Sequence, residues 1–98
     1  MPYILSTDFY KKNELFSTNF LKLSEAHFQR RYRVTEVLLP NEQKQRLAHV
    51  GAYVGSTVTP LRKAPLADPT EYMFGDIRIG IRKCFADKIV VRELSPDD

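Results

Sequence analysis

The sequence predicts a small, mainly β fold, and three observations carry that prediction. Short runs rich in Val, Ile, Thr and Tyr recur along the chain, and such residues favour pleated strands. Turn residues separate the runs, with Gly55-Ser56 and Gly75-Asp76 as the clearest pairs. One short helical pattern, residues 41–50, follows the first strand. We therefore expect a small barrel of about five strands with one short helix after its first strand.

The first strand is predicted for residues 31–39, RYRVTEVLL. Pro40 ends it, because proline has no N–H to donate to a neighbouring strand. Asn41 is expected to cap the helix that follows, and Glu42 suits the positive end of the helix dipole. Gly51 is expected to stop that helix at its C-terminus.

The second strand is predicted for residues 57–63, where Pro60 indicates an edge strand or a bulge. A short third strand spans residues 72–74. Pro65 and Pro69 lie between the two strands and fix their own φ angles. We interpret this connection as a stiff loop, which suits a tight turn or a docking surface.

The fourth strand, DIRIGIR, places isoleucine at every second position. Because alternate side chains of a strand face opposite sides, Ile77, Ile79 and Ile81 are expected to face the core. Arg78 and Arg82 are expected to face water.

The C-terminal part of the chain is predicted to hold one helical turn, KCFADK, and a closing strand, KIVVREL. Cys84 is interpreted as a small buried apolar residue at the start of that turn. Ile89 and Val91 are expected to point inward, and residues 95–98 form a polar tail.

Residues 1–22 are interpreted as an aromatic-rich extension. Phe9, Phe16, Phe20 and Leu23 fall on one helical face, which predicts a helix. The extension either packs over the domain or serves as an arm for homodimerisation or a partner, since exposed aromatic patches mark interfaces.

The 98 residues carry a net charge of +3 and give a pI of about 9.1, which permits an acidic protein or nucleic acid as partner. With Cys84 as the single cysteine, no intramolecular disulfide can form, which suits a reducing compartment. No apolar run reaches the length of a spanning helix, and the N-terminus lacks a signal-peptide pattern. We expect a cytosolic protein with no direct membrane insertion.

The residue types needed for catalysis are sparse in this sequence. Cys84 and Asp87 do not make a zinc site, which takes four ligands, and no glycine-rich phosphate loop is present. The residues that could ligate Fe²⁺, which the sequence does not bring together, are His27, His49, Asp68 and Asp76. We expect no catalytic residue, no cofactor and no specific metal site.

A basic run with an aromatic residue raises the alternative of nucleic-acid binding. Arg30, Arg31 and Arg33 surround Tyr32, and small barrels bind single strands by stacking bases on aromatics in a cationic groove. The run leads into a strand, however, where alternate residues face opposite sides. A solvated strand edge is the simpler interpretation, and no nucleic acid is expected.

Residues 23–94 resemble the FeoA family, the bacterial ferrous iron transport protein A. The positions that match the family pattern in order are Arg46-Leu47, Val50-Gly51, Gly55, Ala64-Pro65, Asp68-Pro69 and Ile81-Arg82. The sequence departs from that pattern at Val54, where a proline is usual, and at Ala67, which replaces the glycine of a Gly-Asp-Pro turn. Phe28-Gln29 lacks the usual Pro-Gly turn.

The resemblance implies an SH3-like five-stranded barrel that also resembles the C-terminal domain of DtxR-type iron-dependent repressors. It implies a cytosolic accessory protein without enzymatic activity, whose partner is the membrane protein FeoB through its cytosolic GTP-binding portion or its membrane domain. The alternatives are a metal-responsive regulatory module or a nucleic-acid-binding barrel.

The surfaces expected to contact the partner are the helix and the proline-rich loop. The residues are Arg46, Leu47, Val50, Pro65, Leu66, Asp68 and Pro69. Leu47 is equally well interpreted as a core residue.

Overall fold

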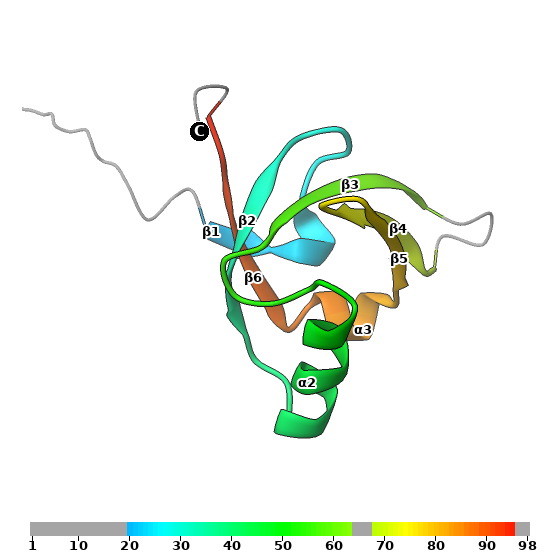
Figure 1. Cartoon of the computed structure of the whole chain (residues 1–98). Helices are drawn as coiled ribbons and strands as arrows, with labels where there is room; N and C mark the ends of the chain where they lie inside the picture. The colour runs from blue at the N-terminus through cyan, green and yellow to red at the C-terminus, as the bar shows by residue number, and fades with distance from the viewer. Residues whose placement is uncertain (1–19, 64–67, 96–98) are drawn as a thin grey trace, which may run out of the picture.

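The computed structural model describes residues 20–63 and 68–95 of the chain. Within these ranges one antiparallel sheet has six strands in the order β1-β6-β2-β3-β4-β5 (Figure 1). The strands are β1 (Phe20–Lys22), β2 (Tyr32–Val37), β3 (Thr57–Lys63), β4 (Thr70–Phe74), β5 (Ile77–Ile81) and β6 (Ile89–Glu93). The helical segments are the 3-10 turn η2 (Leu23–Glu25), α2 (Asn41–His49) and α3 (Lys83–Ala86).

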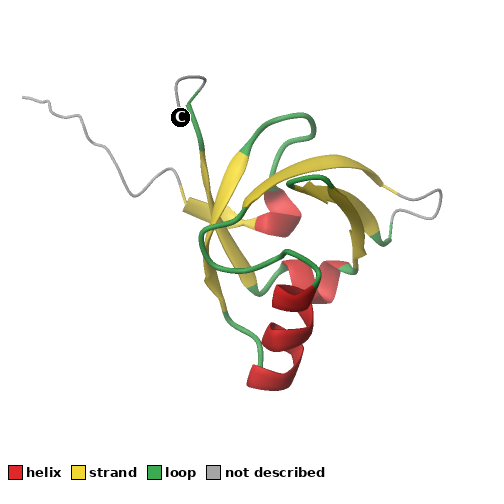
Figure 2. Cartoon of the chain, in the orientation of Figure 1, coloured by secondary structure: helices red, strands yellow, loops and turns green. Residues whose placement is uncertain are grey.

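The sheet curls around a single core, to which η2 and α3 each contribute one buried residue, Leu23 and Ala86 (Figure 2). The mainly β prediction is confirmed, and in residues 20–63 and 68–95 the one helix longer than a single turn is α2, which follows β2. The expected strand number of five was wrong, because Phe20–Lys22 pairs with the free edge of β6 and adds β1. The sheet is also not closed, since β1 and β5 lie at opposite ends of the strand order.

The segment just before η2 differs from the helix predicted there. Phe20–Lys22 is extended and pairs with β6, with Leu21 opposite Val91. The unpaired N–H and C=O groups along the edge of β6 offer this segment backbone hydrogen bonds that outweigh its weak helical periodicity. Leu23 is 1% exposed in the core. Residues 1–19, which hold the rest of the predicted helix, lie outside the described ranges.

The helix α2 begins one residue earlier than the predicted cap at Asn41 implies. Pro40 occupies the N-cap position, Asn41 is already helical, and no side chain caps the helix. The cap prediction was therefore wrong, and the proline with its fixed φ opens the helix instead. Gly51 follows the helix with φ of 102°, which confirms it as the C-terminal stop.

The strand β3 carries the irregularity that Pro60 predicted. The pairing with β4 shifts register between Pro60 and Arg62, which is a bulge. β2 pairs with β3 only at Thr57 and Val58, so Pro60 lies beyond the end of β2, where its carbonyl accepts a hydrogen bond from the Gln29 N–H at 2.8 Å. The bulge is confirmed, and no residue of β2 pairs with Pro60.

The core is formed by residues from every strand except the short β1, together with Leu23 of η2, Ala86 of α3 and Ala52 in the loop after α2. Its buried members are Leu23, Tyr32, Val34, Val37, Ala52, Val58, Tyr72, Phe74, Ile81, Ala86, Ile89 and Val91. The inward positions predicted for Ile89 and Val91 are confirmed. Burial raises the pKa of the Tyr72 hydroxyl above its usual value.

Two predictions of burial were wrong. Ile77 is 49% exposed, because it stands at the turn end of β5, while Ile81 at the other end is buried and Ile79 is partly buried. Cys84 is exposed, because the single turn of α3 directs Ala86 rather than Cys84 into the core.

Candidate partner-binding groove

A groove of about 290 Å³ lies between α2, the C-terminal end of β5, and α3. Figure 1 shows α2 and α3 next to each other at one end of the sheet. The residues that line the groove are Leu39, Gln43, Arg46, Leu47, Gly80, Ile81, Arg82 and Phe85. Two segments that are far apart in the sequence, residues 39–47 and 80–85, therefore share one concave surface.

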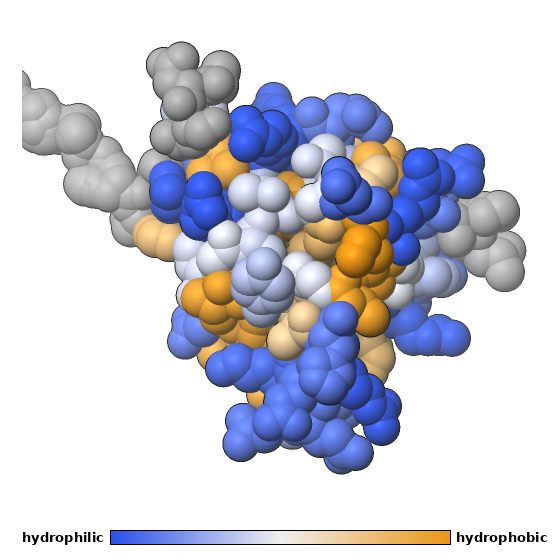
Figure 3. All heavy atoms as spheres, viewed as in Figure 1, coloured by the Kyte–Doolittle hydropathy of each residue, from blue (hydrophilic) through white to orange (hydrophobic). Residues whose placement is uncertain are grey.

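The floor of the groove is apolar. Leu47 is partly buried and packs against the core cluster, and Ile81 at the end of β5 is 3% exposed. Phe85 on α3 is 36% exposed, so a large part of its ring remains available to a partner. Figure 3 shows that the outer surface of α2 is hydrophilic and that apolar patches interrupt the surface beside it.

The rim of the groove is basic. Arg46 comes from α2 and Arg82 from the junction of β5 and α3. A guanidinium nitrogen of Arg46 lies 3.4 Å from a carboxylate oxygen of Glu42, and both side chains are largely exposed. An exposed pair of this kind contributes little to stability.

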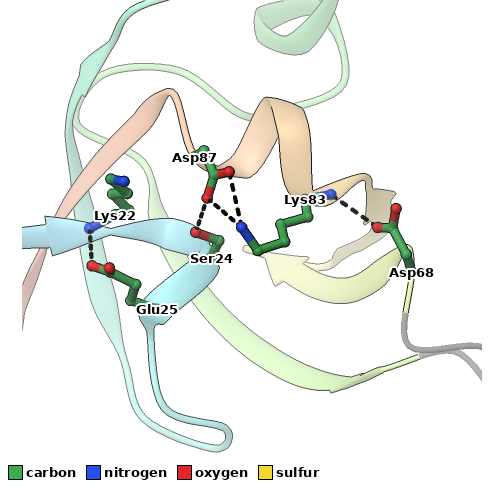
Figure 4. A network of polar contacts seen from close by, with 6 residues as sticks. All are labelled: Lys22, Ser24, Glu25, Asp68, Lys83 and Asp87. Atoms are coloured by element: carbon green, nitrogen blue, oxygen red, sulfur yellow. Dashed lines mark hydrogen bonds and ion pairs between the residues drawn. The ribbon is translucent and has the colours of Figure 1, made fainter.

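Two residues of the proline-rich connection lie beside the groove. Asp68 Oδ1 accepts a hydrogen bond from the backbone N–H of Lys83 at 2.9 Å (Figure 4). Pro69 lies against Gly80, since a Cβ at Gly80 would lie 3.5 Å from Pro69 Cγ. The peptide bond between Asp68 and Pro69 is cis. These contacts attach the end of the connection to one wall of the groove.

A second set of polar contacts holds α3 to the N-terminal part of the domain. Asp87 accepts a hydrogen bond from the Ser24 hydroxyl, and Lys83 Nζ lies 3.1 Å from Asp87 Oδ2 (Figure 4). The hydrogen bond from Ser24, followed by that from Lys83, holds the pKa of the Asp87 carboxyl below its usual value. Lys83 thus contacts both Asp68 and Asp87, one through its backbone and one through its side chain.

The structure brings together some, not all, of the residues expected to contact a partner. Arg46 and Leu47 line the groove, and Asp68 and Pro69 lie beside it. Val50 is 42% exposed but does not line the groove.

Val50 directly precedes Gly51, which lines a separate hollow beside the β4–β5 turn together with Tyr53 and Ile77. Tyr53 and Ile77 are about half exposed, at 52% and 49%. Pro65 and Leu66 lie outside the described ranges.

Sequence reasoning missed the contribution of α3 to this surface. Phe85 was included only in a helical turn, and Arg82 only as a water-facing residue. A signal for them is present in the sequence. Ile81-Arg82 matches the family pattern, and it is followed by the aromatic Phe85 in a helical turn that is too short to bury a large ring. Only the folded sheet shows that this turn faces α2.

The basic run before β2 does not form a stacking surface. Tyr32 is 0% exposed, and its hydroxyl accepts a hydrogen bond from the backbone N–H of His27 at 2.9 Å. Arg33 donates a hydrogen bond to the carbonyl of Gly55, and Arg30 lies 3.5 Å from Glu93. The aromatic residue that base stacking would need is therefore in the core.

Metal-ligating residues and apolar helices bear on two other kinds of site. Across residues 20–63 and 68–95, no group of three or more His, Cys, Asp and Glu side chains is placed to hold a metal ion. In the same part of the chain, no helix is long and apolar enough to cross a membrane.

The family of the chain follows from a direct comparison. Residues 21–93 match the FeoA domain family. The chain belongs to the FeoA family. A sequence search among curated proteins finds no significant match.

Solved FeoA structures share both sequence and fold with the chain. The FeoA protein of Chlorobium tepidum is 33% identical with a TM-score of 0.73, over 80% of this chain and 74% of that one. The FeoA of Stenotrophomonas maltophilia, solved with zinc and described as a prokaryotic SH3 domain protein, is 28% identical with a TM-score of 0.61. That match covers 72% of this chain and 88% of the other. The SH3-like fold expected from the resemblance is confirmed.

The same fold occurs in metal-dependent repressors. ScaR with bound Zn²⁺ is 22% identical with a TM-score of 0.66, over 76% of this chain and 37% of that one. At this identity the match shows the fold alone. The predicted relation to the barrel of such repressors is confirmed at the level of fold.

Proposed function

We propose that this FeoA protein is a non-enzymatic accessory factor of bacterial ferrous iron uptake that docks on the cytosolic portion of FeoB through the groove. Family membership supports the link to ferrous iron transport. The FeoA of Stenotrophomonas maltophilia is described as a candidate ferrous iron transport activating factor. The observation that carries the docking site is the apolar groove between α2, β5 and α3.

The groove suits a protein partner better than a small substrate. Its volume of about 290 Å³ lies at the lower limit for ligand pockets, and its floor continues into exposed Phe85. Buried aromatic anchors carry a large share of the binding energy in protein interfaces. A side chain of the partner that packs on Phe85 and Leu47 would be such an anchor.

The mechanism follows from linkage between binding and conformation. A bound protein shifts an equilibrium only by its difference in affinity for the two states. The FeoA protein therefore changes FeoB activity if the groove binds one nucleotide state of FeoB more tightly than the other. Docking in this way also holds the protein at the cytosolic face of the membrane.

The test is a calorimetric titration of the full chain into the cytosolic domain of the cognate FeoB, with and without a GTP analogue. We expect saturable binding that depends on nucleotide. Phe85→Ala should weaken it by at least about fivefold, since truncation of an interface anchor costs more than about 1 kcal/mol. The matched control is Phe28→Ala, because Phe28 is 44% exposed and does not line the groove.

Two results would contradict the proposal. Absence of binding to both the cytosolic domain and full-length FeoB would remove FeoB as the partner. Equal loss of binding in Phe85→Ala and Phe28→Ala would remove the groove as the docking site. The metal-responsive regulatory alternative stays a prediction.

A further inference from the structure

We propose that the groove recognises an acidic, apolar segment of its protein partner, in which a bulky apolar side chain is flanked by carboxylates that bind Arg46 and Arg82. This inference rests on the proposed function, because it takes the groove as the docking surface. It adds the chemistry of the occupant.

The apolar floor sets the first requirement. Leu39, Leu47, Ile81 and Phe85 line the groove, and its volume of about 290 Å³ has room for one or two large side chains. Phe85 is the one aromatic residue among the lining residues that the structure describes. Grooves that bind proline-rich helices are lined by several aromatic side chains, so this groove is less suited to such a ligand.

The charges around the groove set the second requirement. Arg46 and Arg82 are its charged lining residues in the described part of the chain, and they come from different elements. Arg46 has only an exposed contact with Glu42 at 3.4 Å, which a partner carboxylate can replace at little cost. Within residues 20–63 and 68–95, the side chain of Arg82 has no ion-pair or hydrogen-bond partner.

The neighbouring acidic residues are already engaged. Asp68 accepts the backbone N–H of Lys83, and Asp87 is bonded to Ser24 and Lys83. Neither lines the groove. The groove therefore presents two guanidinium groups above an apolar floor, and a carboxylate matches the planar donor geometry of each.

The experiment compares three blocked octapeptides, added to the full ¹⁵N-labelled chain and followed by backbone amide shifts. The acidic peptide is GSELFESG, its amide counterpart is GSQLFQSG, and GSEGGESG keeps the acids without the apolar pair. We expect the acidic peptide to shift amides of α2, the end of β5, and α3. Its Kd should be at least about fivefold lower than that of the amide peptide, since charge-assisted hydrogen bonds exceed about 1 kcal/mol. It should be lower than that of GSEGGESG by a similar factor, since GSEGGESG lacks the Leu and Phe that the acidic peptide buries in the groove.

Paired variants test the two arginines directly. Arg46→Gln with Arg82→Gln should abolish the preference for the acidic peptide. The matched control, Lys44→Gln with Arg78→Gln, removes the same charge from exposed residues of α2 and β5 that do not line the groove, and should keep the preference. All four positions are exposed, so the fold is expected to persist, and the thermal midpoint checks this.

The outcomes separate this inference from the proposed function. Three results would overturn the inference. The three peptides could bind equally, no amide could shift at about millimolar peptide, or the two double variants could have equal effects. FeoB binding that is unaffected by the Arg46/Arg82 double variant would also overturn it while leaving the proposed function intact. Peptide discrimination without any FeoB binding would support the inference and point to a different acidic partner.

Discussion

The carboxylate of Asp68 accepts a hydrogen bond from the backbone N–H of Lys83, with 2.9 Å between oxygen and nitrogen. Lys83 is the first residue of α3, and the first N–H groups of a helix have no partner within it. A residue of the β3–β4 connection therefore supplies the cap that α3 lacks locally, since no side chain at its own N-cap does so. The contact fixes the connection to a wall of the groove.

Replacement of Asp68 tests the importance of this cap. Asp68→Ala should lower the free energy of unfolding by about 1 kcal/mol, as for the loss of a helix cap. It should also weaken partner binding, because α3 positions Phe85. Urea denaturation measures the first effect, and calorimetry the second.

The control for that change is Asp68→Asn, which keeps an acceptor oxygen for the Lys83 N–H. It should retain most of the stability. If Asn and Ala proved equally destabilising, the charge of Asp68 and not its hydrogen bond would be responsible.

The pH dependence of stability should contain a contribution from Asp87. Its pKa in the folded protein is lower than the usual 3.8 because Ser24 and Lys83 donate hydrogen bonds to the carboxylate. A lowered folded pKa means that the unfolded chain binds the proton more tightly, so the contribution is fully present above pH 3.8 and is lost as pH falls through the folded value. Thermal midpoints of the wild type and Asp87→Asn, measured from about pH 7 to about pH 2, should converge at the acidic end.

Ser24→Ala offers an independent check of the same contribution. It removes the hydrogen bond from the Ser24 hydroxyl, which is the largest cause of the lowered pKa of Asp87. The thermal midpoint of Ser24→Ala should therefore also converge with that of the wild type in acid. A difference between Asp87→Asn and wild type that stays constant over the whole pH range would contradict the assignment.

Leu47 has two roles in the structure, since it packs against the core cluster and lines the groove. Leu47→Ala should therefore destabilise the protein by about 2 kcal/mol, through lost burial and a residual cavity, and also weaken partner binding. Leu47→Met, which conserves volume, should cost less than about 1.5 kcal/mol. Denaturation curves and the FeoB titration measure the two effects on the same samples.

Leu38 serves as a control, because its truncation removes the same apolar atoms from a side chain outside the core and the groove. Leu38 is 54% exposed and does not line the groove, so Leu38→Ala should change neither property. Full stability in Leu47→Ala would show that its packing against the core contributes nothing measurable.

The buried Tyr32 hydroxyl should contribute through its bond with the backbone. Tyr32→Phe removes the acceptor of the His27 N–H and should cost about 1 kcal/mol. Tyr53→Phe is the matched control, because Tyr53 is 52% exposed, and it should be neutral. Equal effects of the two substitutions in urea denaturation would contradict a structural role for the Tyr32 hydroxyl.

Much of the fold could be predicted from local patterns. The strands that became β2, β3, β5 and β6, the helix α2, the turn at Gly75-Asp76 and the bulge near Pro60 each have a short-range signal. Propensity, periodicity and the special geometry of Gly and Pro act within a few residues, so they can be read without a structure. Ile77 and Cys84 show the limit, because their exposure depends on which elements cover them.

Local sequence patterns specify the strands β2, β3, β5 and β6, the helix α2 and its end at Gly51, and ordered matches such as Arg46-Leu47 and Ile81-Arg82 indicate the family. The pairing of Phe20–Lys22 with β6 and the position of Phe85 opposite α2 across a groove are visible only in the folded protein. The two groups differ in the range of the interactions that form them. Strand pairing and groove formation join residues far apart in the chain, and their free energy appears only when the core brings those residues together.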